Sequence, residues 1–330
     1  MLSKKGIALI IANAEYINQP QLKSCKKDGE DMCNVLEKLN FDVFFAADQS
    51  RLELFSTISE FLKNADLYST VLLYYTGHGV QIDGANFFVP VDCIYNTNKD
   101  IFIATQLVGV NVIQDYMDQH SEKTNIMILD ACRSNPGFSR DIVGAGLAEI
   151  KAGSGTFVAF ATAPDKVAGC AADENGNGFY TECLLRHIEQ PNIKIEDMFK
   201  EVRKDVIDLT GGAQIPWEST SLKTDFYFNI MTKDEIDDWI YKTIRNSYSA
   251  STLVELSIKS RHSISNLMRI YNRQKSEKPG GIYFGSEDEF EKNILRQILD
   301  LKFYFEDYRW KYDGIPVVMG EFYHTTWSNL

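Results

Sequence analysis

The sequence predicts an α/β fold, in which a doubly wound, mostly parallel sheet of six strands carries helices on both faces. Short uninterrupted apolar runs, typical of strands buried on both faces, recur along residues 5–230. Between them lie segments whose apolar residues recur at helical spacing. A chain of 330 residues with 44% hydrophobic residues is also long enough to bury a sizeable core.

The predicted elements follow one another in the alternating order that such a sheet requires. The first strand is expected at residues 7–11, which are all apolar, and the first helix at residues 28–39, where Met32, Leu36 and Leu39 share one face. Further strands are predicted at residues 41–46, 71–75, 126–129, 156–160 and 225–228. Further helices are predicted at residues 52–62, 112–117, 181–188 and 195–209.

The chain changes character after residue 230, so we expect two regions, 1–230 and 231–330. The second is expected to be smaller and mainly helical, with helices at residues 233–245, 253–271 and 287–308. Residues 259–278 of this region form a locally basic stretch, rich in Lys and Arg. Such a stretch is either a solvated helix face or a surface for a regulator or a nucleic acid.

Composition excludes several classes of function. The net charge of −12 argues against a general nucleic-acid binder, because such proteins are basic. No run of 18 uncharged apolar residues predicts a membrane span, and the apolar run after Lys5 is too short for a signal peptide. Six cysteines without close metal-ligand spacing indicate a reducing compartment, so a cytoplasmic protein is expected.

Two short motifs carry the chemistry. In the first, His78 stands between Gly77 and Gly79, shortly after the third predicted strand. These glycines free the backbone and leave the Gly79 N–H open to a developing oxyanion. In the second, Cys132 follows the fourth predicted strand and precedes Arg133, a setting that favours a thiolate.

Each motif alone has a plain structural explanation. His78 fits a surface histidine in a glycine turn, and Cys132 fits an inert buried thiol. Together they form the smallest set for nucleophilic catalysis, a cysteine and an activating base. Because reactive groups gather at the carboxyl ends of parallel strands, the two side chains can meet if their strands are neighbours.

At these residues the sequence resembles the caspase-like cysteine peptidases, and within them the bacterial caspase homologues, paracaspases and metacaspases. The resemblance covers roughly residues 5–230 and rests on residues 74–79 (Tyr-Tyr-Thr-Gly-His-Gly) and 130–133 (Asp-Ala-Cys-Arg). The separation between His78 and Cys132 is close to the roughly 50 residues that separate the catalytic histidine and cysteine of caspases. The resemblance implies a caspase-like fold and an endopeptidase with Cys132 as nucleophile and His78 as acid and base. It also implies an oxyanion hole formed by the N–H groups of Gly79 and Cys132.

Asp130 departs from the Gln-Ala-Cys signature of caspases and matches paracaspases and metacaspases, which cut after Arg or Lys. The resemblance places Asp28 and Asp130 in the pocket for that basic residue, with Asp165 as a further acid. Paired carboxylates suit a guanidinium because they accept charge-assisted hydrogen bonds. The structural alternatives are a helix-start carboxylate for Asp28 and a turn residue for Asp130.

The resemblance also sets expectations about cofactors and partners. Many metacaspases bind calcium through an acidic insertion after the histidine. No such insertion follows His78, so no metal or other cofactor is expected. The expected partners are a protein or peptide substrate with Arg or Lys at the cleavage site, and a regulatory protein that binds residues 231–330. No membrane contact is expected. Arg140 and Lys151 lie where such an enzyme could cut itself, and bacterial relatives suggest a regulated effector of defence or cell death.

Two other hypotheses remain open from the sequence. One is a catalytically silent caspase-like scaffold, against which the intact His and Cys pair argues. The other is an unrelated doubly wound protein such as a phospho-receiver or a nucleotide binder. The sequence lacks both a GxGxxG motif after its first strand and a P-loop, which argues against that reading.

Overall fold

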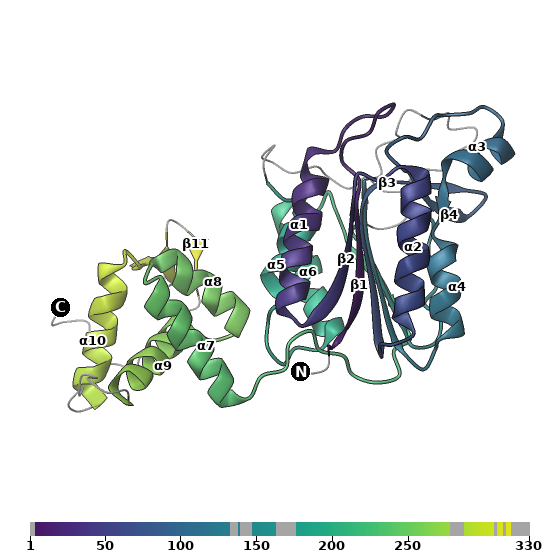
Figure 1. Cartoon of the computed structure of the whole chain (residues 1–330). Coiled ribbons are helices and arrows are strands. Elements are labelled where there is room, and N and C mark those ends of the chain that lie inside the picture. The colour runs from purple at the N-terminus through teal and green to yellow at the C-terminus, as the bar shows by residue number, and fades with distance from the viewer. Residues whose placement is uncertain are drawn as a thin grey trace. The chain divides into compact units, whose positions relative to one another are not determined.

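A computed structural model of the chain describes residues 4–132, 138, 147–162, 176–277, 287–306, 309–312 and 315–317. The predicted fold class, a doubly wound and mostly parallel sheet with helices on both faces, is confirmed (Figure 1). Six strands form the continuous path of the sheet, in the spatial order β2 (Phe41–Ala47), β1 (Gly6–Ala12), β3 (Thr70–Ile82), β6 (Thr124–Cys132), β7 (Thr156–Phe160) and β8 (Trp217–Thr220). All neighbours on this path are parallel except β7 and β8.

Two short strands extend the sheet beyond this path. The far end of β3 pairs with β4 (Ala85–Phe88), which pairs in turn with β5 (Val108–Gly109), both in antiparallel fashion. The helices of this part of the chain are α1 (Lys23–Lys38), α2 (Arg51–Ala65), α3 (Lys99–Gln106), α4 (Asn111–Gln119), α5 (Phe179–His187) and α6 (Ile195–Leu209).

Helices cover the sheet in two layers, with α1, α5 and α6 on one face and α2 and α4 on the other (Figure 1). Alternate residues of β1 explain why its apolar run is uninterrupted. Ile7, Leu9 and Ile11 pack in the same core cluster as Leu54 of α2 and Ile113 of α4. The intervening residues of β1 are also fully buried, so both faces of the strand select apolar side chains.

Several predicted boundaries are wrong. Residues 225–228 are not a strand. The last strand of the large sheet is β8, and the Phe226 carbonyl instead accepts a hydrogen bond from the N–H of Ile195. The first helix begins at Lys23 rather than at residue 28, because its first turn is polar and hides the helical period. The third strand continues past residue 75 to Ile82, since its pairing with β6 and then β4 extends beyond the apolar run.

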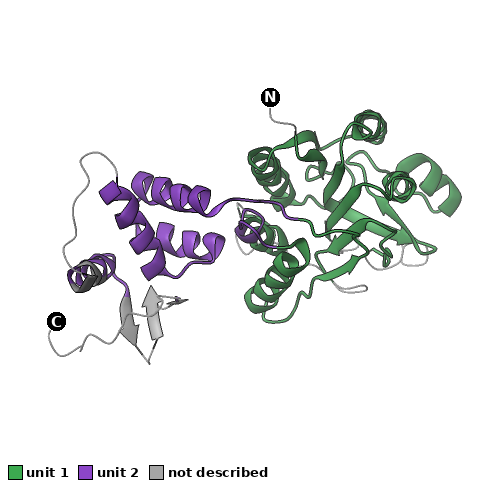
Figure 2. Ribbon diagram, turned by 90° about the horizontal axis from the view of Figure 1, so that it is seen from below, with its two compact units in different colours: residues 1–185, 194–226 green, residues 186–193, 227–330 purple. Residues whose placement is uncertain are grey.

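The chain forms two compact units, residues 1–185 with 194–226 and residues 186–193 with 227–330 (Figure 2). The second unit contains four helices and a small antiparallel sheet among its described residues. These elements are α7 (Lys233–Asn246), α8 (Ala250–Ser260), α9 (Ile264–Glu277), α10 (Glu287–Asp300), β9 (Tyr304–Glu306), β10 (Arg309–Tyr312) and β11 (Ile315–Pro316). The prediction that residues 1–230 and 231–330 are two separate domains stays a prediction.

The helix predicted at residues 253–271 is two helices, because Arg261 adopts a left-handed conformation with φ of 57° between α8 and α9. The basic residues of this stretch are partly neutralised within the unit. Arg273 pairs with the buried carboxylate of Asp237, and the Lys259 ammonium lies 2.7 Å from Glu189. No helix in the described ranges is long and apolar enough to cross a membrane.

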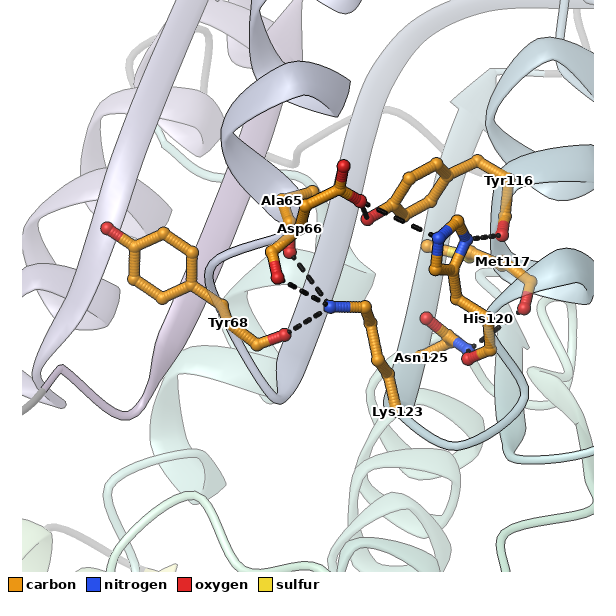
Figure 3. A network of polar contacts seen from close by, with 8 residues as sticks. All are labelled: Ala65, Asp66, Tyr68, Tyr116, Met117, His120, Lys123 and Asn125. Carbon is orange, nitrogen blue, oxygen red and sulfur yellow. Dashed lines mark hydrogen bonds and ion pairs between the residues drawn. The ribbon is translucent and has the colours of Figure 1, made fainter.

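Lys123, just before the amino end of β6, donates hydrogen bonds to the carboxyl end of α2. The Lys123 ammonium donates hydrogen bonds to the carbonyls of Ala65 and Asp66, both at 3.2 Å, and of Tyr68 at 2.7 Å (Figure 3). A cation at this position satisfies carbonyls that the helix leaves without partners and suits the negative end of the helix dipole.

The end of α4 is held at the same edge. The buried Asn125 amide donates to the carbonyls of Met117 and His120, both at 3.1 Å, and the Tyr116 hydroxyl donates to Asp66 at 2.7 Å (Figure 3). The His120 ring stacks on Tyr116 with 4.1 Å between centroids, so this histidine is packed. The network lies at the amino ends of the strands, opposite the edge where His78 and Cys132 stand.

We predict that Lys123→Met lowers the free energy of unfolding by about 1–3 kcal/mol, because three carbonyls lose a charged donor in a partly buried place. Urea denaturation followed by circular dichroism measures the change. Lys204→Met, at an exposed position of α6, is the matched control and should leave the midpoint unchanged. Equal midpoints for both variants would show that the lysine does not stabilise the end of α2.

Candidate active site

His78 and Cys132 lie side by side in the backbone of the sheet. They are register partners in the parallel pair of β3 and β6, at the carboxyl end of the pairing. The prediction that both residues follow their strands is wrong. Cys132 is the last residue of β6, and His78 lies inside β3, where the strand leaves β6 and pairs with β4. The side chain of Cys132 lies outside the described part of the structure.

The glycines beside His78 are required by close packing rather than by a turn. Gly77 has φ of +153°, and a Cβ there would lie 2.8 Å from the hydroxyls of both Tyr16 and Tyr75. A Cβ on Gly79 would lie 2.9 Å from the Cβ of Ala131. A larger residue at either position would therefore push the histidine away from its neighbours.

Two tyrosines hold the backbone and the ring of His78. The His78 N–H donates to the Tyr16 hydroxyl at 2.7 Å, and the Tyr75 hydroxyl donates to the His78 carbonyl. The Tyr16 ring also lies against the imidazole, with 4.5 Å between the ring centroids. His78 is fully buried, so the structural alternative of a surface histidine is wrong.

A backbone carbonyl fixes the tautomer of His78. Its Nε2 lies 2.8 Å from the carbonyl oxygen of Pro20. Since a carbonyl can only accept, Nε2 must carry the hydrogen, and Nδ1 of the neutral ring has an available lone pair. Nδ1 is buried and has no hydrogen-bond partner in the described ranges. Burial lowers the pKa of His78, against a smaller raising effect from the Pro20 carbonyl, so the ring is neutral at pH 7.

Two aspartates stand at the same edge of the sheet. Asp28 lies in the second turn of α1 and Asp130 lies in β6, and both are buried. A Cβ built on Gly178 would lie 3.2 Å from Oδ2 of Asp28 and 3.8 Å from Oδ2 of Asp130. The two carboxyl groups therefore flank the same glycine. Neither structural alternative holds, because Asp28 is not in the first turn of its helix and Asp130 is not in a turn.

Hydrogen-bond donors reach both carboxyl groups. Asp28 Oδ1 accepts from the Gly178 N–H at 2.9 Å and from the Asn177 amide at 3.1 Å. Asp130 Oδ2 accepts from the Thr181 hydroxyl at 2.7 Å. Asn177 and Gly178 directly precede α5 and Thr181 lies in its first turn.

Burial raises the pKa of both acids. For Asp28 the neighbouring charge of Asp130 adds to burial, while the donors from Asn177 and Gly178 act in the opposite direction. For Asp130 only the Thr181 hydrogen bond opposes burial. Two close carboxylates repel each other, so the pair retains a proton more readily than isolated acids do.

The remaining sequence expectations are simply placed. Asp165 and Arg140 lie outside the described residues, and Lys151 is exposed in the segment before β7. Trp217 begins β8 and packs against Phe160 with 5.6 Å between ring centroids, which is a packing role. Among the residues that the structure describes, no group of three His, Cys, Asp or Glu side chains could hold a metal ion.

Two curated relatives match part of the chain. Human mucosa-associated lymphoid tissue lymphoma translocation protein 1 and its mouse homologue are each 31% identical to the chain over 141 residues, which is 43% of the chain and 16% of each relative. The chain thus matches only a small part of these relatives.

Two insect caspases were found among solved structures. The Drosophila initiator caspase Dronc has a TM-score of 0.48 at 15% identity, covering 69% of this chain and 85% of its own. Caspase-1 from Spodoptera frugiperda has a TM-score of 0.49 at 16% identity, covering 70% and 92%. The family model of the caspase domain peptidases matches residues 5–227. Because that match spans more than half of the chain, the protein belongs to the caspase domain peptidase family.

Proposed function

We propose that the protein is a cysteine endopeptidase that cuts after Arg or Lys, with Cys132 as nucleophile and His78 as its acid and base. Membership of the caspase domain family supports the cysteine peptidase class. The observation that carries the specificity is the convergence of Asp28 and Asp130 on Gly178. Asp130 lies two residues before Cys132 in β6, so the acidic pair and the nucleophile share one strand end.

The proposed mechanism uses the tautomer that Pro20 fixes. His78 Nδ1 takes the proton of the Cys132 thiol, and the thiolate attacks the scissile carbonyl carbon. The N–H groups of Gly79 and Cys132 stabilise the resulting oxyanion. The imidazolium then gives its proton to the leaving amine, whose departure leaves a thioester on Cys132. Finally, Nδ1 takes a proton from water, which hydrolyses the thioester and restores the thiol.

The specificity follows from the electrostatics of the acidic pair. A guanidinium or ammonium group between the carboxyl groups favours their ionised forms, and its entry displaces the retained proton. An acidic substrate side chain would meet repulsion instead. Asp165 is retained as a further acid of this pocket.

Wild-type enzyme should cleave fluorogenic peptides that end in Arg or Lys and leave those that end in Asp intact. Asp28→Asn and Asp130→Asn should each lower kcat/KM for the Arg peptide by about 30- to 1000-fold, as expected for breaking a buried charge pair. Asp208→Asn, an exposed position on α6, is the matched control and should keep wild-type activity. Cys132→Ala should abolish turnover.

Turnover of the Asp peptide, or Arg cleavage that survives both pocket variants, would contradict the specificity. No turnover with any peptide library would contradict the peptidase assignment. An unchanged cellular effect of Cys132→Ala would then favour a silent scaffold.

The buried acidic pair should also make the stability of the protein depend on pH. Because the pKa of Asp28 is raised from 3.8 to about 8, the folded state holds a proton that the unfolded state releases. This contribution to stability is complete below pH 4 and is lost as the pH rises towards 8, by at most about 1.4 kcal/mol per pH unit. The difference in unfolding free energy between wild type and Asp28→Asn, measured by urea denaturation, should therefore fall with rising pH. A constant difference across this range would contradict the raised pKa.

We further propose that residues 231–330 bind a regulatory protein and that the protein acts in the cytoplasm, as a regulated effector of defence or cell death. Support for the first is the separate compact unit that most of these residues form. Proximity labelling with the full chain, compared with Cys132→Ala to retain substrates, would identify the partners. Labelling that depends wholly on the acidic pocket would point to substrates alone.

A further inference from the structure

Residues 177–181, around the start of α5, donate hydrogen bonds to Asp28 and Asp130 in different ways. Asp28 has two donors from this segment, the Gly178 N–H and the Asn177 amide. Asp130 has one side-chain donor among the described residues, the Thr181 hydroxyl at 2.7 Å. The ionised form of Asp130 therefore depends on a single hydroxyl group.

This hydroxyl belongs to a buried relay. Thr181 Oγ1 also lies 2.6 Å from the hydroxyl of Tyr74, and both side chains are fully buried. A carboxylate can only accept, so Thr181 must donate its one hydrogen to Asp130 and accept from Tyr74. The order of donation, from Tyr74 to Thr181 to Asp130, is fixed whenever Asp130 is ionised. Hydrogen bonds in such a chain polarise one another in a buried environment.

The relay uses one oxygen of Asp130. Thr181 binds Oδ2, and no described side chain donates a hydrogen bond to Oδ1. The hydrogen bond from Thr181 fixes the rotation of the Asp130 carboxyl group about its bond to Cβ. It does so through Oδ2, the Asp130 oxygen nearest the Cβ position of Gly178, whereas at Asp28 both donors bind Oδ1 and leave the oxygen nearest that position, Oδ2, without a donor.

We propose that Thr181, supported by Tyr74, is a positioning residue for the basic side chain of the substrate, because its hydrogen bond orients the Asp130 carboxylate. The proposal rests on the proposed function and deepens it. Thr181 acts through Asp130, so its loss should weaken substrate binding rather than the chemical step. The first turn of α5 is thereby a determinant of specificity, beside the acids themselves.

The test is steady-state cleavage of an Arg-ending fluorogenic peptide by the full chain, from about pH 5 to about pH 9. Thr181→Val keeps the shape and removes the hydroxyl. We expect KM to rise ~10-fold with kcat nearly unchanged, as for a lost hydrogen bond to a charged group. We also expect the acid limb of kcat/KM to move upwards by about half to one pH unit, because a carboxyl group without its donor has a higher pKa.

Three further variants make the result specific. Thr181→Ser restores the hydroxyl and should restore both KM and the acid limb. Tyr74→Phe removes only the far end of the relay and should shift both in the same direction by a smaller amount, about 3-fold in KM. Thr156→Val, in β7, is the matched control, because its buried hydroxyl has no partner among the described residues. It should match wild type.

A purely structural role for Thr181 would lower the fraction of active enzyme and leave KM and the acid limb in place. That result, with Arg cleavage intact in the wild type, overturns this proposal and leaves the proposed function standing. If Thr181→Val does not fold, an acid limb of Tyr74→Phe identical to wild type overturns the proposal. A wild-type enzyme that cleaves no Arg or Lys peptide overturns both together.

Discussion

The parallel pairing of β3 with β6 is the constraint on which the site depends. Its register runs from Thr70 and Thr124 at one end to His78 and Cys132 at the other. A slip of one residue would turn every buried side chain of β6 to the opposite face, so core packing along the pair holds the register. The alignment of histidine and cysteine is thus maintained by apolar residues such as Leu72 and Ile126, which take no part in the chemistry.

The same edge of the sheet contains more buried polar groups than packing alone would favour. His78, Asp28 and Asp130 are all buried, and burial acts against the charged form of each. For the histidine this keeps the ring neutral, as a base requires. For the two acids it makes the ionised pair costly, because two carboxyl groups share a small volume. Under the proposed specificity, a basic substrate side chain would relieve this repulsion.

The sequence predicted the fold class and the buried strands well, because residues 7–11 and 157–160 are apolar on both faces. It misplaced the end of β3, since Thr76, Gly77 and His78 interrupt the apolar run while the backbone pairing continues. It also missed α3 and β4, which are short and lie outside the repeating pattern. The His and Cys motifs were visible as local patterns. Thr181 was not, because nothing in the sequence links it to an aspartate 51 positions earlier.

The partner of the His78 Nε2 is a main-chain oxygen, that of Pro20, rather than a side chain. Every residue type has the same backbone carbonyl, so a substitution at position 20 can alter the shape of the loop but cannot remove the acceptor. The hydrogen bond that orients the imidazole therefore does not depend on which side chain stands at position 20. It remains exposed to changes elsewhere, above all at Tyr16, whose hydroxyl joins the same loop to the backbone of β3.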